Sequence, residues 1–172
     1  MIAAKKFHYI WKNKEANFGP PLKKQVDGGT HITFEIILKK GGKYIALRRP
    51  DAIPGHEHPA KPKTNSKGFL YFCHNLIRYG ESVEECVRRI VKQQTGAAVS
   101  RLKIVHIDSF VQAKDNQWAF MPYVIAELEK IPESGTYGNK VTEVVQFTKT
   151  SIPEDFGWWK NEEIKDFLEK YD

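Results

Sequence analysis

One segment of this 172-residue chain has every mark of an amphipathic helix, and it restricts the fold more than any other. Ser82 and Glu85 form the S-x-x-E pattern of a capping box, and Gly96 stands where a glycine commonly ends a helix. Apolar residues recur between them at helical spacing, namely Val83, Cys86, Val87, Ile90 and Val91. We therefore predict a helix over 82–95 whose apolar face packs on another layer.

Strands are predicted on both sides of this helix, where short runs are rich in β-branched and aromatic residues. The predicted strands are 31–38, 44–47, 69–73, 102–111, 118–128 and 141–147, with a turn at 39–43, a long loop at 51–67 and a second loop at 75–80. A closing helix over 162–171 carries Ile164, Phe167, Leu168 and Tyr171 on one stripe. This order indicates an α+β or mixed α/β sandwich.

The predicted domain organisation is an N-terminal arm, residues 1–30, packed on a single domain formed by residues 31–172. The arm contains four aromatic residues, which favour packing on the body: Phe7, Tyr9, Trp11 and Phe18. Its Pro20-Pro21 and Gly28-Gly29 pairs argue against one regular element. A length of 172 residues is typical of one domain.

Composition points to a globular chain in a reducing compartment. Hydrophobic residues make up 41% of the sequence, yet no run reaches the roughly 18 consecutive apolar residues that a membrane span needs. The first 14 residues contain four lysines and no apolar core of a secretory signal. Cys73 and Cys86 are too few for a disulfide framework, so we expect free thiols, no membrane partner and a cytoplasmic protein.

Positive charge is concentrated in the first part of the chain. Residues 1–67 contain 14 Lys and Arg against 5 Asp and Glu, whereas residues 68–172 contain 13 against 16. A basic segment of this kind favours anionic partners such as phosphates and nucleotides. The alternative interpretation is a solvated surface that keeps the protein in solution.

The segment around the predicted helix resembles the motif of the Nudix hydrolase family, G-x5-E-x7-R-E-U-x-E-E-x-G-U, where U is bulky and apolar. Without gaps, the first glutamate falls on Glu81, the arginine on Arg89, the next apolar position on Val91 and the late glycine on Gly96. The resemblance extends over about residues 30–170. It implies the Nudix fold, an α/β/α sandwich with a mixed sheet, and scaffold roles for Glu81 and Arg89 around the loop and helix.

The departures from the motif concern its acidic residues. The glutamate after the arginine is Ile90, and the two consecutive glutamates are Gln93 and Gln94. The first glycine of the motif is Asn75. In the family these glutamates hold Mg²⁺, which prefers anionic oxygen ligands, whereas an amide offers a neutral oxygen and an alkyl group none. We therefore expect no metal and no cofactor at these positions, and little of the family's usual hydrolysis.

Ligand-binding candidates follow from the same resemblance. In the family, the strand that ends in Arg48 and Arg49 borders the substrate cleft, so one of these arginines could hold a phosphate; the alternative is a solvated pair. His74, Gln93 and Gln94 complete the set of candidate ligand-binding residues.

Two other sets of residues offer metal chemistry. Glu143, Glu154, Asp155 and Glu57 are candidates for a replacement base or metal ligand outside the motif, with solvated carboxylates as the alternative. His56 and His58, with Cys73 and His74, have the side chains that zinc prefers, but their spacing matches no standard zinc motif. Trp158 and Trp159 are expected to pack the closing helix against the sheet.

Three functions are consistent with these features. The favoured one is a Nudix-fold protein that binds a nucleotide or phosphorylated small molecule with little or no hydrolysis, as a monomer or a homodimer. The alternative is an active Mg²⁺- or Mn²⁺-dependent pyrophosphohydrolase with a rewired site. The third is an interaction module that reuses the fold; no base-reading or RNA-binding motif accompanies the basic arm, so we do not expect nucleic acid as the partner.

Overall fold

The computed structural model describes residues 30–49, 67–78, 80–111, 113, 116–134 and 141–172. Within these ranges the strands are β1 (Thr30–Lys40), β2 (Lys43–Arg49), β3 (Phe69–Tyr71), β4 (Cys73–Leu76), β5 (Val99–Val111), β6 (Trp118–Leu128) and β7 (Glu143–Phe147). The helices are α4 (Val83–Thr95) and α5 (Asn161–Tyr171). The predicted arm, apart from Thr30, and the predicted loop 51–67, apart from Lys67, lie outside the described residues.

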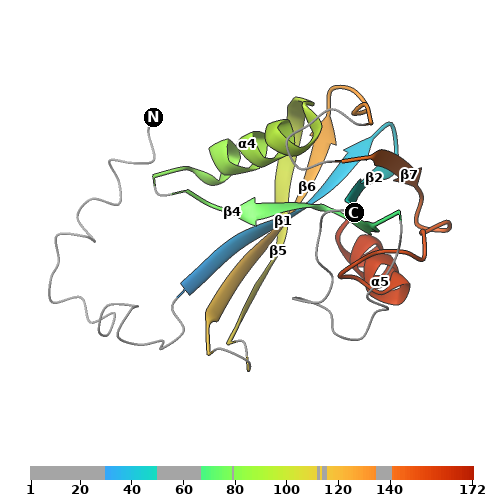
Figure 1. The fold of residues 1–172 in the computed structure, drawn as a ribbon. Coiled ribbons are helices and arrows are strands. Elements are labelled where there is room, and N and C mark those ends of the chain that lie inside the picture. The colour runs from blue at the N-terminus through green and yellow to red at the C-terminus, as the bar shows by residue number, and fades with distance from the viewer. Residues whose placement is uncertain (1–29, 50–66, 79, 112, 114–115, 135–140) are drawn as a thin grey trace, which may run out of the picture.

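All seven strands form one mixed sheet with the order β3-β2-β1-β6-β5, in which β4 also pairs with β1 and β7 with β2. The pair β1–β6 is parallel, and the other pairs are antiparallel. Figure 1 shows α4 on one side of this sheet and α5 on the other. The predicted α/β/α sandwich with a mixed sheet is therefore confirmed.

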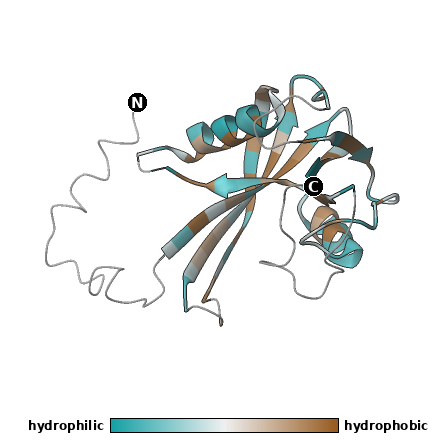
Figure 2. Cartoon of the chain, in the orientation of Figure 1, coloured by the Kyte–Doolittle hydropathy of each residue, from teal (hydrophilic) through white to brown (hydrophobic). Residues whose placement is uncertain are grey.

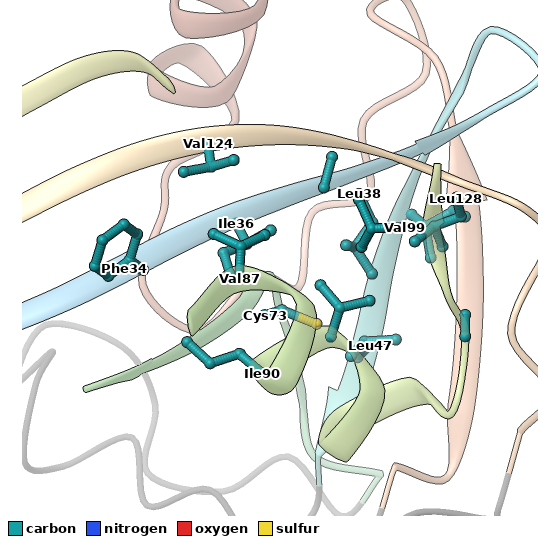
Figure 3. Close-up of a cluster of buried hydrophobic side chains, with 14 of the residues drawn as sticks. Phe34, Ile36, Leu38, Leu47, Cys73, Val87, Ile90, Val99, Val124 and Leu128 are labelled. Carbon is teal, nitrogen blue, oxygen red and sulfur yellow. The ribbon is translucent and has the colours of Figure 1, made fainter. Parts of the chain in front are cut away.

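Each helix covers its own hydrophobic cluster. On the α4 side, Cys86, Val87, Ile90 and Val91 pack on residues of β1, β2 and β6 (Figure 3). On the α5 side, Ile164 and Leu168 pack on a cluster rich in aromatic side chains. The predicted apolar face of the first helix is confirmed, and polar residues cover its outer surface (Figure 2).

Several predicted boundaries were wrong. The single strand 69–73 is two strands, because β3 pairs with β2 whereas β4 leaves it to pair with β1. As a result β4 continues to Leu76, where a loop was predicted. β5 begins at Val99 rather than at residue 102, and β7 begins at Glu143 rather than at residue 141. Along β5 the alternating pattern is broken by bulges, which weakens the sequence signal.

No helix in the described ranges is long and apolar enough to cross a membrane.

Candidate functional site

The start and end of α4 are fixed by local hydrogen bonds. The Ser82 hydroxyl accepts from the backbone N–H of Glu85 at 3.2 Å, and the Glu85 carboxylate accepts from the backbone N–H of Ser82 at 2.8 Å. At the other end Gly96 adopts the left-handed conformation, with φ +67°, and its N–H reaches the carbonyl of Lys92 at 2.9 Å. These caps determine where the helix begins and ends, and side-chain hydrogen bonds from Arg89 and Gln94 connect it to β4.

Glu81 and Arg89 form a two-point ion pair at the start of this helix. Arg89 donates through Nη2 to Glu81 Oε2 at 2.8 Å and through Nε to Glu81 Oε1. The backbone N–H of Arg78 also donates to Glu81, at 2.9 Å. The hydrogen bond from Arg89 is the main reason why the pKa of Glu81 falls to about 2. Glu81 is therefore ionised and already engaged at neutral pH.

Two side chains of α4 hydrogen-bond to the backbone of β4. Arg89 Nη2 donates to the carbonyl of Leu76 at 2.9 Å, and Gln94 Nε2 donates to the carbonyl of His74 at 2.7 Å. These carbonyls are two residues apart on an edge strand, so the helix supplies donors that no neighbouring strand provides in the described structure. Gln94 is only 1% exposed.

Ile90, Gln93 and Gln94 are the residues at which the resemblance described above would place glutamates. Ile90 is fully buried in the cluster under α4. Gln93 is exposed and accepts a hydrogen bond from Arg89 Nη1 at 3.2 Å. Gln94 acts as a donor to a carbonyl, a role that an ionised carboxylate lacks because it only accepts.

These three side chains do not fit a hard divalent cation. Mg²⁺ requires anionic or strongly polar oxygen atoms, whereas the groups present are one alkyl chain and two amides. In the described part of the chain, no group of three or more His, Cys, Asp and Glu residues could hold a metal ion.

A second group of side chains, the β4 cluster, consists of Arg49, Tyr71, His74 and Trp158. The guanidinium of Arg49 lies 5.9 Å from the centre of the Tyr71 ring, and Trp158 contacts that ring edge-on at 5.1 Å. The His74 and Trp158 rings are only 3.8 Å apart between centroids. The cluster lies next to Gln94, because Gln94 binds the backbone of His74.

Buried polar atoms gather in and beside the β4 cluster. Arg49 Nε, His74 Nδ1, Trp158 Nε1 and Gln94 Oε1 are buried and have no hydrogen-bond partner among the described residues. Burial, with smaller contributions from Arg49 and His31, lowers the pKa of His74 to about 3. The imidazole is therefore neutral at physiological pH, and Arg49 supplies the positive charge of the cluster.

Arg48 and Arg49 are adjacent in β2 but have different surroundings. Arg48 is 9% exposed. Its Nε donates to the carboxylate of Glu143. Its Nη1 donates to the carboxylate of Asp155 at 2.5 Å and to the carbonyl of Gly68 at 2.8 Å. Arg48 is thus held by two of the proposed replacement carboxylates. The structure therefore brings Arg48, Glu143 and Asp155 together in one ion-pair cluster. None of the three has a hydrogen bond to Gln93 or Gln94 among the described residues.

The remaining candidates are separate from these clusters. Glu154 is exposed, and no ion pair joins it to another described residue. Glu57, His56 and His58 lie outside the described residues. Cys73 and Cys86 are free, buried thiols on the α4 side of the sheet, and burial raises the pKa of both; that of Cys86 is about 11.

The sequence alone did not single out Glu35. This carboxylate is 2% exposed on β1, directly opposite His74, and accepts a hydrogen bond from Trp159 Nε1 at 3.1 Å. The only sequence feature that could have pointed to Glu35 is its charge, because it lies inside the otherwise largely apolar strand predicted over 31–38. Trp159 contacts Phe167 of α5, as predicted, but Trp158 packs on His74 and Tyr71, so the prediction that both tryptophans contact the closing helix was wrong.

Comparison with solved structures identifies the fold. A MutT Nudix hydrolase from Burkholderia pseudomallei superposes with a TM-score of 0.58 at 15% identity, over 82% of this chain and 97% of the other. A pyrophosphohydrolase of Bacillus subtilis superposes with a TM-score of 0.54 at 20% identity, over 79% of this chain and 74% of the other. A Nudix hydrolase from Nitrosomonas europaea superposes with a TM-score of 0.54 at 12% identity, over 83% of this chain and 91% of the other. Neither known sequence families nor curated proteins give a match. The architecture of this chain is therefore that of the Nudix hydrolases.

Proposed function

We propose that this protein binds a nucleotide or another phosphorylated small molecule and has little or no metal-dependent hydrolase activity. The observation that carries the proposal is the use made of the second half of α4. Ile90 is a core residue and Gln94 is a buried donor to the carbonyl of His74. Positions that resemble metal-ligand positions of the Nudix motif thus serve packing and backbone hydrogen bonding.

The β4 cluster supports a binding role for the same region. Arg49 is the cationic member, and guanidinium groups bind phosphate oxygens through charge-assisted hydrogen bonds. Arg48 is already engaged by Glu143 and Asp155, so Arg49 is the better candidate of the two. His74 adds a neutral ring nitrogen and Trp158 an indole N–H, both without partners among the described residues.

The class of ligand is suggested by the fold and by charge. The structurally similar proteins include hydrolases and a pyrophosphohydrolase, whose name refers to hydrolysis of a pyrophosphate bond. The excess of Lys and Arg in residues 1–67 would draw anions toward this end of the chain. A nucleotide or a phosphorylated metabolite fits both features.

Calorimetry of the full chain against nucleoside mono-, di- and triphosphates, with and without Mg²⁺, tests the proposal. We expect binding that does not require Mg²⁺. Arg49→Gln should weaken it at least tenfold, because a charge-assisted hydrogen bond contributes roughly 1.5–3 kcal/mol. The matched control is Lys165→Gln, which removes one positive charge from the exposed surface of α5 and should leave binding unchanged.

A hydrolysis assay on the same compounds covers the alternative. Release of phosphate that depends on Mg²⁺ or Mn²⁺ and disappears in Glu154→Gln or Glu57→Gln would show a rewired hydrolase and contradict the proposal. Failure of every nucleotide to bind would also count against it.

A further inference from the structure

The strand β5 is a long sheet edge with an apolar surface. It spans Val99–Val111 and, among the described residues, pairs with β6 alone. Ile104 and Ile107 are 40% and 47% exposed, and Phe110 and Val111 are also exposed. An edge of 13 residues with such side chains is suited to pairing with another strand.

A bulge in β5 places both isoleucines on one face of the sheet. The pairing with β6 shifts between Ile104 and His106, so that Val105 is the additional residue. Ile104 lies opposite Val124, and Ile107 lies opposite Pro122. Because these β6 residues are two apart, Ile104 and Ile107 share the face that α4 covers elsewhere.

The charged neighbours of the isoleucines share the opposite face. Lys103 lies opposite Ile125, and Asp108 lies opposite Met121, four residues away on β6. Lys103 and Asp108 therefore both lie on the α5 side of the sheet, and neither is buried. The bulge thus makes residues 103–108 of β5 symmetric about the midpoint between Val105 and His106, with opposite charges at the two ends of this segment.

We propose that a second copy of this chain docks on β5, through antiparallel pairing about a two-fold axis between Val105 and His106. In such a pair, Ile104 lies opposite Ile107 of the partner subunit, and Lys103 lies opposite Asp108 of the partner subunit. A two-fold axis repeats each contact, so the interface contains both pairs twice. Apolar contact and charge complementarity coincide in one register.

Other registers lose this agreement. A shift by one residue would set each isoleucine opposite a side chain on the other face of the sheet. A bulge ordinarily discourages pairing along an edge, because a regular strand does not follow the bend. A second β5 carries the same bulge at the same place, and it therefore follows the same course.

Sedimentation of the full chain over a concentration series tests the proposal, with a dimer as the expected species. Ile107→Asp should raise the dissociation constant at least tenfold, equivalent to about 1.4 kcal/mol. Ile131→Asp changes a similarly exposed isoleucine that is outside β5 and outside the proposed pairs, and should leave the dimer intact. A monomer at every concentration, or a dimer that Ile107→Asp does not weaken, would overturn the proposal.

Charge reversal tests the register itself. Lys103→Asp and Asp108→Lys should each weaken self-association, because each homodimer would then contain two like-charged pairs. Mixing the two variants should restore association, since both pairs across the heterodimer become oppositely charged. Asp108 also contacts His106 within its own chain, at 2.9 Å. Recovery on mixing separates the interface from that local contact, and its absence would contradict this register.

Discussion

The ion-pair clusters of this molecule differ from the region around Gln94 and His74 in how their polar groups are paired. Glu81 is paired with Arg89, and Glu143 and Asp155 are paired with Arg48. Beside β4, by contrast, Gln94 and His74 are neutral at physiological pH, and each has a buried polar atom without a partner among the described residues.

The difference indicates where a divalent cation could and could not be held. A cation site needs negative charge that no arginine has neutralised. In the ion-pair clusters the arginines already neutralise the carboxylates, and beside Gln94 the side chains of the β4 cluster are neutral or, at Arg49, positively charged. The chain therefore has the fold of the Nudix hydrolases, while Ile90 and Gln94 of α4 are occupied with structural contacts.

The largest expected effect comes from placing a carboxylate where α4 meets the core. Ile90→Glu should lower the free energy of unfolding by about 4 kcal/mol or more, because an unpaired charge would be buried in an apolar cluster. Ile90→Leu is the control and should cost less than about 1.5 kcal/mol. Denaturant unfolding measures both. A stable Ile90→Glu protein that gained Mg²⁺-dependent hydrolysis would contradict the conclusion that α4 does not hold a divalent cation.

Removing the arginine of the largest ion-pair cluster should have the next effect. Arg48→Met leaves Glu143, Asp155 and the carbonyl of Gly68 without their donor, and we expect a loss of about 3 kcal/mol of stability. Lys165→Met removes an exposed partner of Glu169 and should cost about 0.5 kcal/mol or less. Equal losses in the two variants would show that Arg48 is no more structural than a surface lysine.

Sequence reasoning predicted the framework better than the site. The caps of α4 and its apolar face depend on local patterns, and the sequence showed them directly. Whether Arg48 or Arg49 is engaged depends on residues about a hundred positions away, such as Glu143 and Asp155, which no local pattern connects to β2.

The same limit applies to β4 and Gln94. The chain between Phe69 and Leu76 changes its pairing partner from β2 to β1, and only the assembled sheet reveals that change. A glutamine in a helix gives no sign that it will donate to an edge strand twenty residues earlier. Its departure from the Nudix motif was visible, but the use of its amide was not.

A smaller loss of stability is expected from a change at Gln94, near the end of α4. Gln94→Glu should cost about 2 kcal/mol at neutral pH, because the donor to the His74 carbonyl is replaced by a buried acceptor. The cost should shrink as the pH falls, since a protonated carboxyl can donate again. Gln93→Glu is the matched control, exposed and beside Arg89, and should be nearly neutral. Thermal unfolding between neutral and acidic pH compares the two, and equal losses would mean that Gln94 has no special contact.

The smallest effect should come from the partly buried ion pair of Glu81 and Arg89, and its dependence on pH identifies it. The folded pKa of about 2 lies below the ordinary value of 4.5, so the pair contributes stability above pH 4.5 and loses it as the pH falls toward 2. Glu81→Gln removes the titrating group, so its melting temperature should lie below that of the parent protein at neutral pH, and the gap should close between pH 4.5 and 2. Glu84→Gln, which removes an exposed carboxylate paired with Arg88, is the control for the loss of one negative charge from α4. A gap that stays constant with pH would mean that Arg89 stabilises the loop through the Leu76 carbonyl and not through Glu81.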